Sequence, residues 1–491
     1  MRSGAGYSRP PRPRCAALPL TGLLALLACG APSVRHASAD EYDDDDDGDN
    51  DVDPARVAEV EPAAGYGLVP RYPATGNIAV RLHPGKGVPI GRPTVVSFGV
   101  PFPPGVLSSA DQLSAFRRRG SELRMHADAI LPWRVWPGRK GMRRSVRAAM
   151  VSVEVTFPRR APLAISLRYG AGPGASLPAP RDPRAGWVAM KGDEYPAGTV
   201  REPRVYATFS PRWLGSCLLR TRSTPAGADR DWAWFDEAML GFARTAVNDV
   251  PASVTQLIPY TSDHGAWLFD RTATLFGVYV RTGDVKWMRH AHRSAQFYLR
   301  HVTDKGVFDL KPQPDLKYSY GRSLLMDFMF TGDPALLAAI ERIAAAGLEW
   351  NPVYGPRTNF WTERHQAYAL LAALSAWQAS GSPQHAARAR EVARATFAMS
   401  ARPASPWKPD GCPLHTMESH EGAGGAEPVC SPWMSALLAD AVWEYYIHSE
   451  DREALVFLAG LGHFVVDYAL YPGDRKIAHT MPWYVVPSSA R

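Results

Sequence analysis

The sequence predicts a multidomain α+β protein, in which an N-terminal β barrel or sandwich is followed by an (α/α) toroid of helical hairpins. Two observations lead to this prediction. From about residue 74 to 210, alternating apolar and β-branched residues are punctuated by proline and glycine, as in strands joined by turns. After about residue 232 the periodicity is helical and repeats at a fixed spacing, which is typical of stacked helix pairs.

The N-terminus predicts export. Four arginines precede CAALPLTGLLALLA (15–28), which has the length of a signal-peptide core but is too short to span a bilayer. Two cleavage sites compete. Ordinary signal peptidase would remove residues 1–39, whereas Leu26-Leu27-Ala28-Cys29 resembles a lipobox and would leave Cys29 lipidated. The protein is therefore expected to be an outer-membrane lipoprotein, a periplasmic protein or a secreted protein. A lipid anchor would be its sole contact with a membrane.

Residues 40–70 are expected to form a disordered acidic tether, because DEYDDDDDGDNDVD (40–53) carries ten acidic side chains in fourteen residues. Calcium binding by this segment is an alternative, although the glycine and glutamate spacing of an EF-hand loop is missing. No other cofactor is expected.

The whole chain has a formal net charge of +7, and the net charge of residues 54–491 alone is more positive than this. A basic exported protein favours an acidic polysaccharide partner, unless a base-composition bias explains the arginines. No nucleic-acid-binding motif is present, and a monomer is expected.

The β domain is predicted to span residues 71–225. Its candidate strands share period-two alternation or β-branched runs. They are IAVRLH (78–83), TVVSFGV (94–100), AAMVSVEVTF (148–157) and LAISLRY (163–169). Residues 225–231, PAGADRD, are predicted to link this domain to the helical one, which spans 226–491.

The helical domain repeats around short polar turns. The turns are Thr282-Gly283-Asp284, Thr331-Gly332-Asp333, Ser380-Gly381-Ser382 and Ser449-Glu450-Asp451. The first three lie 49 residues apart and the fourth lies 69 residues after the third. The last unit therefore carries an insertion of 20 residues, which falls on CPLHTMESHEGAGGAEPVC (412–430). In an exported protein a disulfide between Cys412 and Cys430 is expected, with Cys217 as a buried thiol.

Zinc is the alternative for this insertion, bound by Cys412, His415, His420 and Cys430. The spacing of these residues fits no usual zinc pattern, so no metal site is expected. The longer loops of a helical-hairpin array gather at one end and lead into the first helix of each pair. Helix N-termini favour anions there, and long loops on a rigid scaffold usually carry function. A cleft at that end is therefore the predicted site.

The segment VSFGVPFPPGVL (96–107), followed by PWRVWPGRKGMRRSVRAAMVSVEV (132–155), resembles the N-terminal barrel of the exo-acting rhamnogalacturonan lyase-like family of bacteria. The family has a GVPFPxG opening, which residues 99–105 match, whereas RSVRAAM (144–150) replaces the family's aspartate-glycine-serine run. The resemblance covers about residues 74–470. It implies a RIFT-type barrel followed by an (α/α) toroid, and lyase activity on an acidic glycan. Family members usually carry a further C-terminal β domain, for which little sequence remains.

Lyases of acidic polysaccharides neutralise a uronate carboxylate, remove the neighbouring proton and protonate the leaving oxygen. The candidate catalytic residues are Tyr320 as acid, His365 or His420 as base, and Arg364 as the carboxylate's partner. The candidate substrate-binding residues are cationic, polar or aromatic residues of the same loops. They are His264, Trp267, Arg322, Arg357, Trp361, His415, Glu418, Glu421 and Trp433.

Each candidate also has a structural interpretation. The tryptophans would fill the toroid core, Arg364 and His365 would form an ion pair or cap with Glu363, and Tyr320 would be a packed tyrosine. Two other functions stay open. An inverting glycoside hydrolase would use two separated carboxylates from among Asp263, Glu363, Glu418 and Glu421, and a non-catalytic protein would only bind the glycan.

Overall fold

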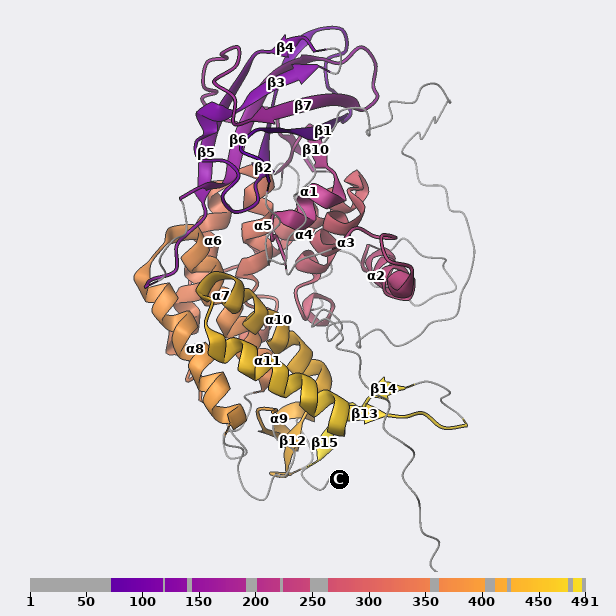
Figure 1. Ribbon diagram of the computed structural model, residues 1–491, viewed down its shortest axis with the longest axis vertical. Helices are drawn as coiled ribbons and strands as arrows, with labels where there is room; N and C mark the ends of the chain where they lie inside the picture. Colours follow the sequence, from indigo (N-terminus) through magenta and orange to yellow (C-terminus); the bar gives the residue numbers. More distant parts are fainter. Residues whose placement is uncertain are drawn as a thin grey trace, which may run out of the picture.

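The computed structural model describes residues 72–117, 120–138, 144–190, 201–220, 224–247, 264–353, 362–401, 411–421, 425–475 and 480–487. The predicted signal peptide, Cys29, the acidic tether, Arg357 and Trp361 lie outside these residues. Within them the chain is mixed α and β, with strands first and helices after them, as the sequence predicts (Figure 1). Among the described helices, none has both the length and the apolar character that crossing a bilayer requires.

Two antiparallel sheets make up most of the N-terminal part. The larger has the order β10-β1-β7-β3-β4 and the smaller the order β2-β6-β5. Their strands are β1 (Gly76–Pro84), β2 (Pro93–Pro101), β3 (Ser114–Arg117), β4 (Glu122–Leu123), β5 (Met125–Pro132), β6 (Val146–Thr156), β7 (Leu163–Tyr169) and β10 (Val205–Phe209). A short ribbon pairs β8 (Val188–Ala189) with β9 (Arg201–Glu202). The four sequence-predicted strands correspond to β1, β2, β6 and β7.

Burial along these strands follows the residue pattern. In β1, Ile78, Val80 and Leu82 are buried while their neighbours are partly exposed, as expected for a strand with one covered face. Strand β6 is buried on both faces, because α5 (Gly321–Thr331) covers the smaller sheet from the other side. Gly99 in β2 lies against the α5 backbone at Met329, where a Cβ atom would clash. A glycine at this position therefore lets the sheet pack directly on the helix.

Polar contacts add to this junction between strands and helices. Glu202 in β9 accepts hydrogen bonds from Arg289, at 2.8 and 2.9 Å, and from Arg293, at 3.0 Å. Both arginines lie on α4 (Val285–Arg300). Arg134 donates to the carbonyl of Ala379 at 2.9 Å, and Arg147 donates to the side chain of Gln378. The β part is thus fixed to two of the helical hairpins.

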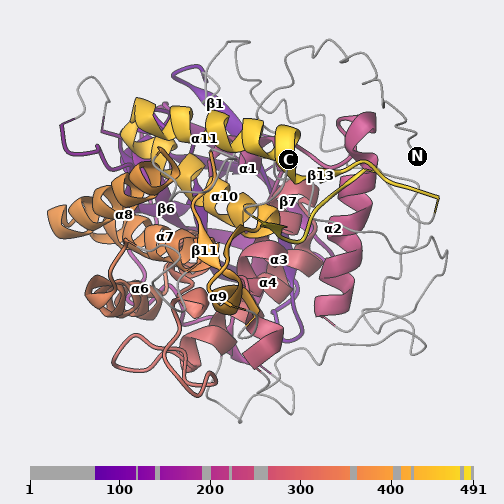
Figure 2. The same ribbon diagram turned by 90° about the horizontal axis from the view of Figure 1, so that it is seen from below.

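The described helical part contains four helical hairpins, at the positions that the repeat predicts (Figure 1). They are α3 (Arg271–Thr282) with α4, α5 with α6 (Pro334–Ala346), α7 (Glu363–Ser380) with α8 (Pro383–Ala401), and α10 (Pro432–Ser449) with α11 (Arg452–Phe464). The first helices contact one another in the order α3, α5, α7, α10. In Figure 2, α7 and α10 lie nearer the middle of the molecule than α6, α8 and α11.

The hairpin turns explain why the repeat is visible in the sequence. Gly283, Gly332 and Gly381 end α3, α5 and α7 with φ angles of 69°, 65° and 75°. Glycine adopts this left-handed conformation at little cost, so it recurs at the same point of each unit. In the fourth hairpin Glu450 takes this place with a φ of 53°. An aspartate then caps the second helix in three of the units: Asp284, Asp333 and Asp451.

Other elements were not predicted. Two short helices, α1 (Pro211–Ser216) and α2 (Ala233–Ala246), precede the first hairpin. The inserted loop contains β11 (His415–Thr416), α9 (Met417–Glu421) and β12 (Pro428–Cys430), and β12 also pairs with β15 (Val486–Pro487). A second ribbon joins β13 (Leu470–Tyr471) to β14 (Met481–Pro482). The insertion and the C-terminal segment therefore form one small sheet.

The cysteines agree with the predicted pairing. Cys412 and Cys430 form a disulfide, with Cα atoms 6.4 Å apart. It joins the start of the insertion to the residue before the α10 N-cap, Ser431. Cys217 is a buried thiol outside the disulfide, with its sulfur 3.4 Å from the carbonyl oxygen of Pro101.

Candidate functional site

The first helices of the four hairpins begin at one end of the helical part. Side-chain contacts between their starting segments show this. The Tyr320 hydroxyl, just before α5, donates to the carbonyl of Trp267, just before α3, at 2.6 Å. At the start of α7, Arg364 lies over the ring of Trp433, which starts α10. We call this region the helix-start end. It is the region in which the sequence predicts the site.

A cation and aromatic rings meet at the helix-start end. The guanidinium carbon of Arg364 is 5.5 Å from the centre of the Trp433 ring. Trp433 stacks on Tyr484, with centroids 6.0 Å apart and planes at 17°. Phe269 contacts the same indole edge-on at 5.4 Å. Tyr484 is 60% exposed, so this stack reaches the surface, and an aromatic face beside a cation is suited to binding a sugar acid.

Next to Arg364 lies a buried polar group. His365 Nδ1 accepts a hydrogen bond from the backbone N–H of Thr362 at 3.1 Å, and its Nε2 is 3.5 Å from an Asp315 oxygen. Asp315 caps the 3-10 helix η6 (Leu316–Tyr318) and pairs with Lys317 at 3.3 Å. Because Nδ1 is the acceptor, the Nε2 atom carries the proton toward Asp315. His365 thus holds the start of α7, which is the cap that its structural interpretation anticipated.

The charges in this group shift one another's pKa values. Burial lowers the pKa of the Lys317 ammonium; the charge of Asp315 opposes this shift, and that of Arg364 adds to it. Burial alone would raise the pKa of Asp315, but His365 and Lys317 hold it at about 2. Burial also lowers the pKa of His365. The Lys317 amine is therefore easier to deprotonate than an ordinary lysine, and its side chain is 15% exposed.

Lys317 was not among the sequence-predicted residues. It lies within one of the longer loops, KPQPDLKYSYGR (311–322), but a lysine two residues after an aspartate is typical of an ordinary surface pair. Only the packing of η6 against α7 shows that Arg364 is close enough to lower its pKa. Lys317, Arg364, Trp433 and Tyr484 together form what we call the basic–aromatic cluster.

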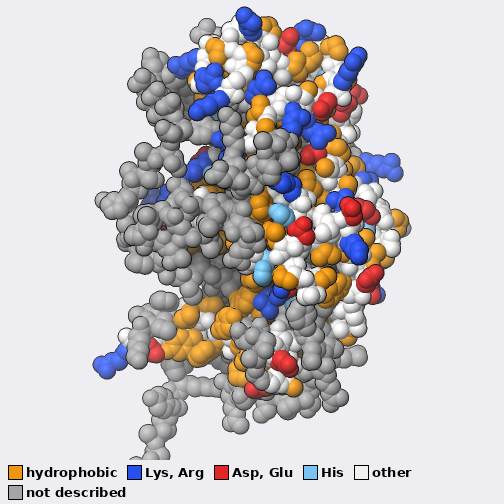
Figure 3. All heavy atoms as spheres, turned by 180° about the vertical axis from the view of Figure 1, so that it is seen from behind, with side chains coloured by type: hydrophobic (Ala, Val, Ile, Leu, Met, Phe, Trp, Pro, Cys, Tyr) orange, Lys and Arg blue, Asp and Glu red, His pale blue; other side chains and the backbone are white. Residues whose placement is uncertain are grey.

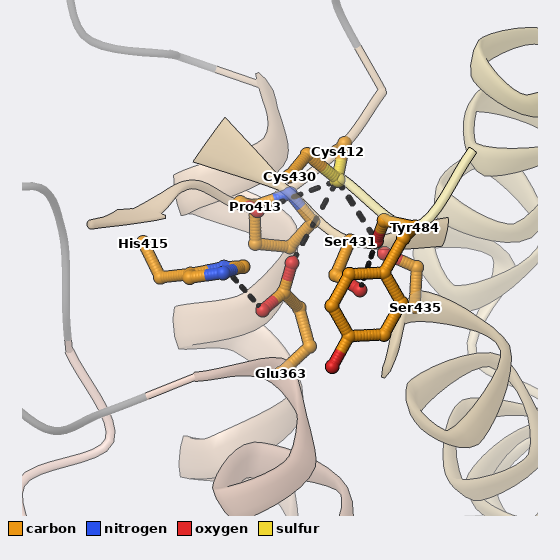
Figure 4. Close-up of a disulfide and its surroundings, with 8 residues drawn as sticks. All are labelled: Glu363, Cys412, Pro413, His415, Cys430, Ser431, Ser435 and Tyr484. Carbon is orange, nitrogen blue, oxygen red and sulfur yellow. Dashed lines mark hydrogen bonds and ion pairs between the residues drawn. A yellow bond between two sulfur atoms is a disulfide. The ribbon is translucent and has the colours of Figure 1, made fainter. Parts of the chain in front are cut away.

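A buried histidine–glutamate pair lies beside the disulfide (Figure 4). The Nδ1 atom of His415 is 2.7 Å from the Glu363 carboxylate, and both side chains are fully buried. The other oxygen of Glu363 is 3.9 Å from the Cys412 sulfur. His415, predicted to bind substrate, thus lies in the interior and pairs with the first residue of α7.

A cluster of charges also runs between the first helices. Arg322 donates to Asp440 at 2.7 Å and to Glu444 at 3.2 Å, and Arg220 is 3.8 Å from Asp440. Although burial alone would lower the pKa of Arg322, the two carboxylates raise it. Arg322, predicted to bind the substrate's carboxylate, is therefore occupied by carboxylates of α10.

Asp270 lies next to this interior cluster. Its carboxylate caps α3 by accepting from the N–H of Ala273 at 3.0 Å, and it is 2% exposed. Burial raises its pKa from 3.8 to about 6, against the opposing effects of the α3 cap and the nearby arginines. Phe269 and Asp270 both have left-handed backbone, with φ of 70° and 56°. Such a conformation is uncommon for a bulky residue and is found preferentially at functional sites.

The remaining predicted residues are placed as follows. Tyr320 is 2% exposed and Trp267 is 1% exposed, stacked on Phe297 at 4.6 Å, so both lie in the core. His264 is half-buried beside the Tyr318 ring, at 6.1 Å, and Glu418 is exposed on α9. The side chains of His420 and Glu421, like Arg357 and Trp361, lie outside the described part of the chain.

Comparisons with known proteins leave the family open. No protein-family model matches this chain, and no curated protein matches it either.

Proposed function

We propose that this protein is an exported polysaccharide lyase-like enzyme that cleaves a uronate-containing glycan, such as rhamnogalacturonan, by β-elimination. The proposal includes a β barrel followed by an (α/α) toroid, as in the family that residues 96–107 resemble. The single observation that carries it is the basic–aromatic cluster, in which Arg364 lies over the Trp433 ring and Trp433 stacks on the exposed Tyr484. In the same cluster, burial and the charge of Arg364 lower the pKa of Lys317.

The cluster suggests a role for each member. Arg364 would bind the uronate carboxylate, because a guanidinium pairs with a carboxylate through two hydrogen bonds. Lys317 would remove the neighbouring proton, because burial and the charge of Arg364 lower its pKa and make the neutral amine more accessible than in an ordinary lysine. Trp433 and Tyr484 would stack on the sugar rings. The β-elimination then breaks the bond to the 4-linked sugar, whose oxygen takes up a proton.

Two sequence-predicted roles change in this proposal. His365 uses both ring nitrogens within the fold, toward Thr362 and Asp315, so it becomes a positioning residue rather than the base. Burial raises the pKa of the Tyr320 hydroxyl well above its usual value, and that hydroxyl already donates to Trp267. Tyr320 therefore also positions the helix starts.

The net charge of the sequence, +7, is compatible with an anionic substrate. Lys and Arg side chains gather over the β part, at the top of the face drawn in Figure 3. The β part packs on the hairpin turns, at the end opposite the helix-start end, so these side chains would act on a polyanion at long range and not within the cluster. The buried disulfide is compatible with export, since such bonds persist outside the cytoplasm. Neither calcium nor any other cofactor has a role in the proposed chemistry.

Glycoside hydrolysis is the second candidate. One observation favours it: burial raises the pKa of Asp270 to about 6, as a general acid requires, and Asp440 accepts a hydrogen bond from Arg322 in the same charged interior. Both carboxylates are almost fully buried, which favours the lyase over the hydrolase. A protein that binds the glycan without cleaving it is the third candidate.

An assay on polygalacturonate, rhamnogalacturonan and neutral glycans separates the three. A lyase produces the ultraviolet absorbance of an unsaturated uronate together with new reducing ends. Reducing ends without that absorbance indicate a hydrolase, and glycan binding with neither product indicates a binding protein. Lys317→Met and Arg364→Ala should abolish the ultraviolet product. Arg168→Ala is the matched control, because it removes an arginine that lies over an aromatic ring, Phe116, in the β part.

A further inference from the structure

Four buried side chains of the kinds that bind zinc meet at the disulfide. Cys412, Cys430, Glu363 and His415 are each 0% exposed. Ligand atoms of the first three lie within 4.8 Å of one another. They come from the start of α7, from the first residues of the insertion and from the end of β12 (Figure 4). Three segments of the chain therefore supply this set.

We propose that reduction of the disulfide turns this position into a zinc site, in which the Cys412 and Cys430 thiolates and the Glu363 carboxylate bind the ion. His415 supports the carboxylate through its second oxygen. The site is independent of the glycan chemistry proposed above.

The distances agree with such a site. Two ligand atoms on a tetrahedral Zn²⁺ are roughly 3.5 Å apart, as follows from zinc–sulfur and zinc–oxygen bonds of about 2.3 and 2.0 Å. The Glu363 oxygen is 3.9 Å from the Cys412 sulfur. The Ser435 hydroxyl is 3.4 Å from that sulfur and 3.5 Å from the Cys430 sulfur. The separation of Glu363 from Cys412 is thus close to that in zinc coordination, whereas the two bonded sulfur atoms must move apart after reduction, to roughly 3.8 Å. The Ser435 hydroxyl lies beside both sulfur atoms.

The carboxylate is also held ready as a ligand. Glu363 is the first residue of α7, so the helix fixes the position of its backbone. One oxygen faces the sulfur atoms, and the other is 2.7 Å from His415 Nδ1. Histidine and carboxylate partners of this kind orient metal ligands and raise their affinity. A buried carboxylate is costly without a cation beside it, and Zn²⁺ would supply one.

Reduction of the disulfide comes before zinc binding. A thiol reductant transfers two electrons and two protons to the disulfide and gives two thiols. Binding of Zn²⁺ displaces both thiol protons into solution. A disulfide oxidant later removes two electrons from the thiolates, re-forms the sulfur–sulfur bond and releases the ion. Disulfide and zinc are therefore alternative cross-links between Cys412 and Cys430, and zinc would also tie them to α7 through Glu363.

Cobalt titration of the whole protein tests the site. The chain is reduced under anaerobic conditions with a metal-free phosphine, and Co²⁺ is added as a coloured substitute for zinc. We expect thiolate-to-cobalt charge-transfer bands and tetrahedral d–d bands that saturate at one ion per chain and are bleached by Zn²⁺. The oxidised protein should give neither set of bands. The proposal is wrong if the reduced protein gives no such spectrum, or if it unfolds and Zn²⁺ does not refold it.

Two variants that keep the disulfide allow the same test from a folded starting point. After reduction, His415→Gln should bind Zn²⁺ about 10–100-fold more weakly, and Glu363→Gln should lose at least as much affinity because it loses a ligand. Cys217→Ser, which changes the third cysteine of the described chain, should titrate like the wild type. Unchanged affinity in Glu363→Gln, or cobalt bands that persist when Cys412 and Cys430 are both serine, would assign the metal to another place.

Discussion

The guanidinium group of Arg364 lies over the indole ring of Trp433, 5.5 Å from its centre, and so joins the start of α7 to the start of α10. Trp433 also stacks on Tyr484. A cation held beside an aromatic platform suits a sugar that carries a carboxylate. The pair thus links the packing of the helical hairpins to the proposed recognition of an acidic glycan.

Trp433→Ala should weaken glycan binding. Loss of a cation–π and stacking contact of this kind costs about 1–2 kcal/mol, or roughly a fivefold to thirtyfold increase in Kd. Isothermal titration with uronate oligosaccharides measures it. Trp234→Ala is the control, since Trp234 is 46% exposed on α2. Equal affinities of the wild type and Trp433→Ala would remove the stack from the binding surface.

Lys317→Arg should abolish β-elimination at every pH, because arginine keeps the positive charge but does not deprotonate. The pH dependence provides a sharper test. In the wild type, kcat/KM should rise with pH until Lys317 is neutral. Asp315 raises the pKa of Lys317, so Asp315→Asn should lower that pKa and move the rise in rate to lower pH.

The controls for this prediction lie in the same segment. Lys311→Arg changes another lysine of the loop and should leave the pH profile unchanged. If Lys317→Arg retains the wild-type rate, the base is a different residue. If Asp315→Asn moves the profile to higher pH, the coupling between the two side chains has been assigned the wrong sign.

The hairpins were predictable because their signals are local. A left-handed glycine and a following capping residue are fixed by a few neighbouring residues, so Gly283, Gly332 and Gly381 mark the units in the sequence. Strands β1, β2, β6 and β7 were predictable for the same reason, from alternation within one strand. The disulfide followed from the export signal and the insertion. The class of fold and the location of the site-bearing loops thus came from short-range patterns.

The chemistry of individual side chains depends on contacts that sequence spacing does not reveal. Arg322 and Tyr320 occur in a loop rich in candidate residues, yet both turn inward, because their partners Asp440 and the Trp267 carbonyl lie on other hairpins. The same reason hid Lys317, whose lowered pKa arises partly from Arg364 on α7. Glu363 was expected to pair with its neighbours and instead pairs with His415.

Arg322→Met should destabilise the protein by about 3–5 kcal/mol, because it leaves the carboxylates of Asp440 and Glu444 buried with one cation fewer. Urea unfolding measures the change. The double variant Arg322→Met/Asp440→Leu should recover part of the loss, since it also removes one of the buried carboxylates. A single variant with wild-type stability would show that Arg322 is not required for packing and would restore its predicted role in substrate binding.

Asp270→Asn should stabilise the folded protein at neutral pH. Burial raises the pKa of Asp270 from 3.8 to about 6, so the folded state binds this proton more tightly than the unfolded state. The contribution is favourable below pH 3.8 and is lost as the pH rises through about 6. At pH 7 the ionised carboxylate therefore costs up to about 3 kcal/mol. Asparagine avoids this cost, while its side-chain oxygen can still cap α3 and its backbone tolerates the left-handed conformation.

Urea unfolding at pH 7 and pH 3.5 measures the effect of Asp270→Asn. The variant should be more stable than the wild type at pH 7, and this gain should disappear at pH 3.5. Asp284→Asn, at the exposed cap of α4, is the control. An equal effect at both pH values would mean that Asp270 titrates as an ordinary carboxylate, and loss of glycan cleavage in this more stable variant would transfer the catalytic role to Asp270 and the hydrolase chemistry.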